Sequence, residues 1–179
     1  MKDPLFFIAI LPDKQIQDEV TGFKQYCAER FGARHSLTSP PHITIVPPFG
    51  WPKPQLQVLK DALDDFVVDH TPFDIQLVNF GSFPPRVLFV GIGPNKQLAK
   101  MAGNLAIHLK DTIGLEQTSG HGFNPHMTIA HRDLQKEVFP NAWAYFSKQT
   151  YQRTFTAEGL TLLRYGQGQW ELEETFFFS

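Results

Sequence analysis

Two short segments of this sequence carry the same pair of proton-transfer and hydroxyl side chains. The first reads Pro-His-Ile-Thr-Ile and contains His42 and Thr44; the second reads Pro-His-Met-Thr-Ile and contains His126 and Thr128. In a strand, residues i and i+2 project from the same face, so each histidine shares a face with its threonine while the aliphatic residues point the other way. None of the remaining histidines has threonine two positions later. These four polar side chains are therefore candidates for shared chemistry.

Two imidazoles facing one small volume suit phosphoryl transfer without a metal ion. One can accept a proton from the attacking oxygen while the other donates a proton to the leaving oxygen, because an ordinary imidazole pKa of about 6.5 makes both forms accessible near neutral pH. The hydroxyls of Thr44 and Thr128 can hold non-bridging phosphate oxygens. A purely structural alternative makes His42 and His126 half-buried sheet residues bonded to their neighbours, but the duplication of the motif favours catalysis.

The motifs occupy equivalent places in an internal duplication. Segments 6–16 and 88–98 read FFIAILPDKQI and LFVGIGPNKQL, about 80 residues apart, with an apolar strand before each proline. Asp13 and Asn95 follow the prolines as plausible helix N-caps, and each precedes an apolar pattern with a period of 3.6 residues. Each half therefore begins with a strand that leads into a long amphipathic helix.

The rest of each half follows the same order. After the motif strand, we expect a second helix around residues 54–68 and 142–148, the latter shortened by Pro140. Further strands are expected at 73–80, 155–162 and 170–178.

This order predicts an α+β fold of two lobes related by a pseudo-twofold axis. Each lobe would be an antiparallel sheet with helices on its outer face, and the active-site groove would lie between the lobes. Residues 1–179 are expected to form a single bilobal domain from repeats over about 5–80 and 87–178.

Composition limits the function classes. The chain has 179 residues, a formal net charge of −2 and 42% hydrophobic residues, which is typical of a globular protein and excludes disorder. The near-neutral charge argues against coating of long nucleic acids but allows a local cationic pocket. No apolar run approaches the ~20 residues of a membrane span and no signal peptide is recognisable, so we expect a cytoplasmic protein without membrane contact. The single cysteine, Cys27, is expected to pack in the core.

The paired His-x-Thr motifs, the proline before each histidine and their spacing resemble the two-histidine (2H) phosphoesterase superfamily, in particular its bacterial 2′-5′ RNA ligase-like, RNA 2′,3′-cyclic phosphodiesterase members. The resemblance implies opening of a 2′,3′-cyclic phosphate to a 2′-phosphomonoester, with 2′-5′ RNA ligase activity in some members. It implies His42 and His126 as the catalytic pair, and Thr44 and Thr128 as phosphate binders.

The expected substrate is an RNA end or a small cyclic-phosphate nucleotide, and the expected state is a monomer. No phosphate-binding glycine loop, zinc-binding helix or cysteine cluster accompanies the histidines, so we expect no cofactor and no metal. A non-catalytic RNA or nucleotide binder that keeps the phosphate cradle is the alternative from another class. The symmetry of the motifs leaves open which histidine is the acid and which is the base.

Several further positions near the motifs have two interpretations each. Many members of that family carry arginine three residues after the second threonine, whereas here His131 holds the position and Arg132 follows it. In a regular strand this shift turns Arg132 to the other face, but a bulge or the strand end could restore it as a phosphate binder; His131 is expected at the surface. Phe49 and Phe83 could stack a base at the groove mouth, or pack between the lobes. Residues 121–124 could form a lip over the site or an ordinary loop.

Overall fold

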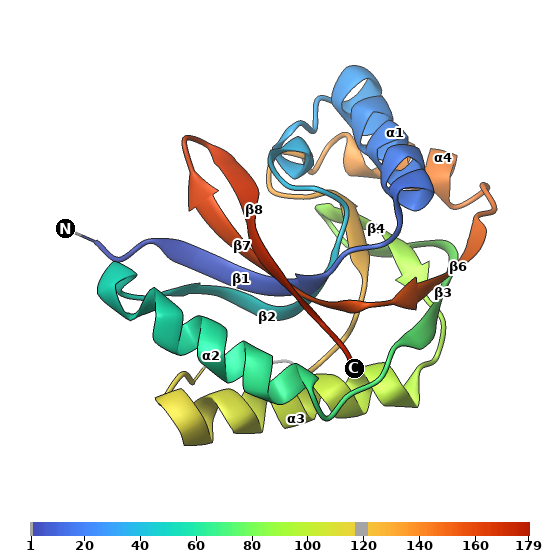
Figure 1. Cartoon of the computed structure of the whole chain (residues 1–179). Coiled ribbons are helices and arrows are strands. Elements are labelled where there is room, and N and C mark those ends of the chain that lie inside the picture. Colours follow the sequence, from blue (N-terminus) through green and yellow to red (C-terminus); the bar gives the residue numbers. More distant parts are fainter. Residues whose placement is uncertain (1, 117–121) are drawn as a thin grey trace.

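The chain forms two four-stranded antiparallel sheets and four α-helices over the residues that the structure describes, 2–116 and 122–179; Figure 1 shows this computed structural model. The strand orders are β2-β1-β7-β8 and β5-β4-β3-β6. The predicted α+β class is confirmed. The strands are β1 (Leu5–Ile10), β2 (Ile43–Gly50), β3 (Phe73–Phe83), β4 (Val87–Ile92), β5 (Met127–Ala130), β6 (Gln152–Ala157), β7 (Gly159–Gly166) and β8 (Gln169–Phe177). The helices are α1 (Lys14–Phe31), α2 (Leu56–Val67), α3 (Lys96–Ile113) and α4 (Phe139–Phe146), with 3-10 helices η1 (His35–Thr38) and η2 (Lys53–Gln55).

The first helix of each repeat begins and ends in the same way. At α1 the carboxylate of Asp13 accepts a hydrogen bond from the Ile16 N–H at 3.0 Å, and at α3 the amide oxygen of Asn95 accepts one from the Leu98 N–H at 2.9 Å. Gly32 and the equivalent glycine after α3 end the helices with φ values of 73° and 70°, where a side chain would be strained. The two predicted N-caps are confirmed.

The two sheets do not each contain one repeat, which corrects the expectation that each repeat builds its own lobe. Strand β3, from the first repeat, pairs with β4 and β6, whereas the hairpin β7-β8, from the second repeat, pairs with β1. The reason is that strands close in sequence pair readily: only residues 84–86 separate β3 from β4, so the two form a hairpin.

The helices are exchanged as well. Helices α2 and α3 lie side by side and pack on the sheet of β1, and α3 contacts β2 of the other repeat (Figure 1). Helix α1 packs instead on β5, and α4 lies next to α1. The main apolar core contains residues from both sheets and all four helices.

Two element boundaries differ from expectation. Proline starts α4 rather than shortening it, because Pro140 lies in the first turn, where its missing N–H costs no hydrogen bond. The strand expected at 155–162 divides into β6 and β7 at Glu158. Gly159 opens β7 against Phe176, whose carbonyl oxygen would clash with a Cβ at this position, so only glycine fits. The final strand is confirmed as β8.

Cys27 is completely buried, as expected, and burial raises the pKa of its thiol to about 12. Among the described residues, no helix is long and apolar enough to cross a membrane. The first residue of the expected lip, His121, lies outside the described residues.

Candidate active site

The edge strands β2 and β5 bring the two motifs together. Each is the outer strand of its sheet, and the two strands contact each other. His42 and His126 immediately precede these strands. Ile43 and Met127 are completely buried, whereas both histidines and both threonines are only half-buried, so the predicted alternation of faces is confirmed. The polar pairs share the side of the sheets opposite the core.

Both motif histidines have the same tautomer, fixed by the backbone. Nδ1 of His42 lies 2.7 Å from the carbonyl oxygen of Pro40, and Nδ1 of His126 lies 2.8 Å from that of Asn124. A carbonyl oxygen can only accept, so Nδ1 carries the proton in both rings. In each neutral imidazole Nε2 is therefore the nitrogen that can accept a proton, and after protonation the one that can donate it.

The surroundings of the two histidines differ. Burial lowers the pKa of His42 to about 4, more than the hydrogen bond to Pro40 raises it, and the positive charges of Lys24, His126 and His131 lower it further. The ring of Phe7 packs against His42 at 4.7 Å. The half-buried ring of His126 packs instead against Phe83 of β3 and Phe89 of β4. The two equivalent sequence motifs thus place their histidines in different surroundings.

A groove of about 410 Å³ opens in front of the motifs, which is within the usual size of small-molecule sites. His42, Thr44 and Thr128 line it, and His126 is close enough for its charge to lower the pKa of His42. Within the described part of the chain, no carboxylate lines this groove. The remaining lining side chains are mostly hydroxyl, cationic, imidazole or aromatic groups: Leu5, Phe7, Lys24, His35, Ser36, Thr38, Ser39, Pro48, His131, Arg132, Tyr165 and Trp170.

The end of β5 places Arg132 at this groove. The strand stops at Ala130, and the backbone of Arg132 has a φ of 54°, which breaks the alternation of a regular strand. Arg132 is exposed and lines the groove together with His131. His131 is half-buried rather than a simple surface residue, because its ring packs at 4.8 Å against the ring of His35.

Sequence reasoning missed Lys24, which also lines the groove. Only 1% of Lys24 is exposed, and its Nζ donates to the carbonyl oxygens of Ser36 and Ser39, both at 2.8 Å. Burial lowers the pKa of this amine to about 7. Its position could have shown it, since Lys24 continues the four-residue spacing of Ile16 and Val20 on the buried face of α1.

The two aromatic candidates for base stacking lie in different surroundings. Phe49 is buried in the core against Phe6, so packing rather than base stacking describes its place. Phe83 is 36% exposed, and its ring lies 5.1 Å from that of His126. Sequence reasoning missed Tyr165 and Trp170, which line the groove and continue the row of rings that begins with Phe7 and His42. In this row the centroid distances are 4.7 Å from Phe7 to Trp170 and 5.1 Å from Trp170 to Tyr165.

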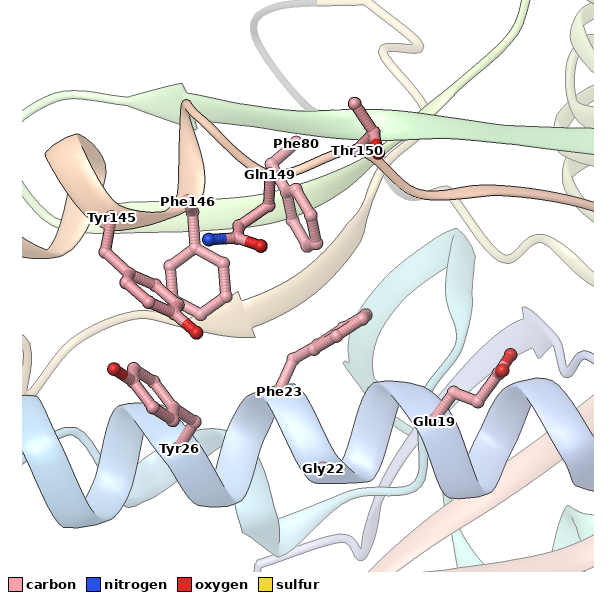
Figure 2. A pocket seen from close by; sticks show the side chains of 9 residues that line it. All are labelled: Glu19, Gly22, Phe23, Tyr26, Phe80, Tyr145, Phe146, Gln149 and Thr150. Atoms are coloured by element: carbon pink, nitrogen blue, oxygen red, sulfur yellow. The ribbon is translucent and has the colours of Figure 1, made fainter.

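A second cavity, of about 310 Å³, lies between α1 and α4, and most of its lining side chains are aromatic. Figure 2 shows Phe23 and Tyr26 of α1 facing the rings of Tyr145 and Phe146 of α4. Tyr26 and Tyr145 stack with their centroids 4.4 Å apart. Arg153 binds Glu19 at the edge of this cavity. Most of the other lining side chains are aromatic.

Metal ligands show no comparable grouping. In residues 2–116 and 122–179, no three His, Cys, Asp or Glu side chains are arranged to hold a metal ion.

The sequence and the fold are similar to known proteins. The family model of the 2′-5′ RNA ligase superfamily matches residues 12–169. "Putative phosphoesterase GK0864" of Geobacillus kaustophilus is 27% identical over 172 residues, covering 94% of this chain and 93% of the relative. A relative in Bacillus cytotoxicus is 28% identical over 171 residues, covering 94% of both chains.

Among solved structures, TT0787 of Thermus thermophilus matches with a TM-score of 0.72 at 18% identity, covering 97% of both chains. E. coli LigT in complex with 3′-AMP matches with a TM-score of 0.68 at 14% identity, covering 99% of both. These likenesses extend over nearly all of the fold described above. Because the family model covers both repeats and both His-x-Thr motifs, this chain belongs to the 2′-5′ RNA ligase superfamily.

Proposed function

We propose that this protein is a metal-independent phosphodiesterase that opens 2′,3′-cyclic phosphates, at RNA ends or on nucleotides, to 2′-phosphates. The observation that carries the proposal is the matched pair of Nδ1 hydrogen bonds to backbone carbonyls, which assigns proton exchange to Nε2 of His42 and of His126. The superfamily and the names of the curated relatives support a phosphoesterase. The solved complex of LigT with 3′-AMP supports a nucleotide as the ligand.

In the proposed reaction, His42 is the general base, because its lowered pKa keeps it neutral at pH 7. Its Nε2 takes a proton from water while the water oxygen forms a new bond to phosphorus. The bond from phosphorus to O3′ breaks, and His126 Nε2 donates a proton to O3′. The products are a 2′-phosphomonoester and a 3′-hydroxyl group, and both histidines return to their starting forms by proton exchange with solvent.

The groove lining supplies the remaining functions. Thr44 and Thr128, which line the groove, are proposed to donate to the non-bridging oxygens, whose charge persists through the displacement. Arg132 is proposed as a binder of a substrate phosphate without a part in the displacement itself, and Phe83 remains the proposed stacking ring near His126. The same groups can act when a 5′-hydroxyl replaces water as the nucleophile: the 5′-oxygen bonds to phosphorus, the bond from phosphorus to O3′ breaks, and a 2′-5′ linkage results. We therefore include 2′-5′ RNA ligase activity in the proposal.

Product analysis tests the proposal. Purified protein is incubated with uridine 2′,3′-cyclic phosphate, and phosphorus NMR identifies the product. We expect the natural chain to form uridine 2′-phosphate. We expect His126→Ala to form no product above background while its circular dichroism spectrum shows that the fold is intact. Absence of hydrolysis by the natural chain, with binding of the cyclic nucleotide retained, would instead support the non-catalytic binder.

A further inference from the structure

A second group of cationic and imidazole side chains lines the groove beside the motif residues. His35 and His131 pack ring against ring at 4.8 Å, and both line the groove together with Lys24 and Arg132. The cluster of these four residues comes from α1, from η1 and from the segment after β5. It therefore unites parts of the chain that are about 100 residues apart.

Hydrogen bonds hold the backbone beneath this cluster. One carboxylate oxygen of Asp133 accepts the N–H groups of Arg34 at 2.8 Å and of His35 at 3.0 Å, which ties η1 to the segment after β5. The hydroxyl of Ser36 donates to the carbonyl oxygen of Ile129 at 2.8 Å. Such contacts fix the positions of the side chains before any ligand binds, which is a property of built binding sites.

The charges of the cluster are not balanced inside the groove. Asp133 lies under the cluster but is not among the groove-lining residues, and the described lining holds no carboxylate. Burial, together with the nearby charges of His35, Arg132 and Lys24, lowers the pKa of His131 to about 4. At pH 7 the lowered pKa leaves His131 neutral, so its ring N–H is a hydrogen-bond donor, and Arg132 supplies positive charge that faces an anion in the groove.

One phosphate does not need all of these groups. The two histidines and two threonines of the motifs already supply the base, the acid and two hydroxyl donors for a single cyclic phosphate. We propose that Lys24, His35, His131 and Arg132 form a second anion subsite, which binds a phosphate carried on the 5′-oxygen of the nucleoside whose cyclic phosphate lies at the motifs. This inference rests on the proposed function and narrows its substrate to nucleosides that carry both phosphates.

Binding measurements test the subsite without relying on turnover. Calorimetry compares adenosine 2′-phosphate with adenosine 2′,5′-bisphosphate, and with a dinucleotide ending in a 2′-phosphate, at fixed ionic strength. We expect the 5′-phosphate to tighten binding by about tenfold, which is about 1.4 kcal/mol, because it adds charge-assisted hydrogen bonds to the complex. Equal tightening by the dinucleotide identifies an RNA end as the source of the phosphate; tightening by the bisphosphate alone identifies a 5′-phosphorylated nucleotide.

Substitutions in the cluster test whether its side chains cause the tighter binding of the 5′-phosphate. His131→Gln and Arg132→Gln keep polar side chains, and each should remove most of the gain from the 5′-phosphate. Lys100→Gln, at an exposed position of α3, is the matched charge control and should keep it. Lys24 is left unchanged because its loss would leave the carbonyl groups of Ser36 and Ser39 without their buried donor.

The outcomes separate this inference from the proposed function. Equal affinity with and without the 5′-phosphate, or a gain that survives both cluster variants, overturns the second subsite. Failure to hydrolyse uridine 2′,3′-cyclic phosphate, with the affinity difference intact, overturns the proposed reaction while leaving the subsite in place.

Discussion

The two cavities beside α1 have similar volumes and opposite linings. On one side, Lys24 points to a groove of about 410 Å³ lined by imidazole, hydroxyl and cationic groups. On the other side, Phe23 and Tyr26 line a cavity of about 310 Å³ whose other walls are mostly aromatic (Figure 2). The aromatic cavity is a gap in the packing between two helices, whereas the groove lies where the edges of two sheets meet. The kind of side chain that lines a cavity, rather than its volume, identifies the candidate site.

The largest expected effect is the loss of activity when a motif histidine is replaced. His42→Gln or His126→Gln should lower kcat/KM for a 2′,3′-cyclic nucleotide by about 10² to 10⁴-fold, because each removes a proton-transfer group. Steady-state kinetics measures the change, and thermal unfolding should show little loss of stability. His70→Gln is the matched control, since Nδ1 of His70 also bonds a backbone carbonyl but lies outside the groove. An equal loss of activity in this control would remove the distinction.

The aromatic cavity should respond in stability instead. Phe23→Ala removes a ring that packs against Phe80 and Tyr151, both at 5.1 Å, and should lower the free energy of unfolding by about 3 kcal/mol. Urea titration measures this loss, and kcat per folded molecule should stay within about threefold. Val58→Ala, at a position 48% exposed on α2, is the control and should cost much less. A fall in activity as large as that of the histidine variants would make the aromatic cavity part of the site.

The threonines should have intermediate effects within the groove. Thr44→Val or Thr128→Val keeps the shape of the side chain but removes one of several donors to phosphate, so kcat/KM should fall by about tenfold. Thr154→Val on β6, which is exposed and away from the groove, should leave the rate unchanged. A loss equal to that of the histidine variants would mean that a threonine takes part in proton transfer.

The smallest effect is expected at the edge of the aromatic cavity. Arg153 binds both carboxylate oxygens of Glu19, at 2.9 and 2.7 Å, and this hydrogen bonding lowers the pKa of Glu19. The ionised carboxylate therefore stabilises the fold above its ordinary pKa of 4.5, and this stabilisation is lost as the pH falls through the lowered value. Because both side chains are partly exposed, Glu19→Gln should cost less than about 1 kcal/mol in urea titration at pH 7. A loss as large as that of Phe23→Ala would contradict this.

Local sequence patterns predicted the elements and the motif residues but not how the elements assemble. The caps Asp13 and Asn95 and the alternation around Thr44 depend on neighbours in sequence, so they could be read directly. The exchange of β3 and β7 between the sheets depends on which distant strands pair, and a duplication leaves that choice open.

The parts of the groove outside the motifs were missed for the same reason. Lys24 falls on the apolar face of α1, and only the fold shows that η1 and the residue after it supply two carbonyl groups to its amine. His131 reaches the groove because β5 ends one residue earlier. Trp170 gains its place through the pairing of β7 with β1, two segments about 150 residues apart.

The most direct test of two-histidine chemistry is a pH series of kcat/KM on uridine 2′,3′-cyclic phosphate, with and without EDTA. The base must be unprotonated, so activity should fall as the pH drops through the lowered pKa of His42, about 4, rather than between pH 5 and 8 as two unperturbed histidines would give. The acid must be protonated, so activity should fall again at higher pH, and the two limbs belong to the coupled pair. We expect the same bell-shaped profile in EDTA. Loss of activity in EDTA that Mg²⁺ or Mn²⁺ restores would contradict the account, because the histidines would then act as metal ligands.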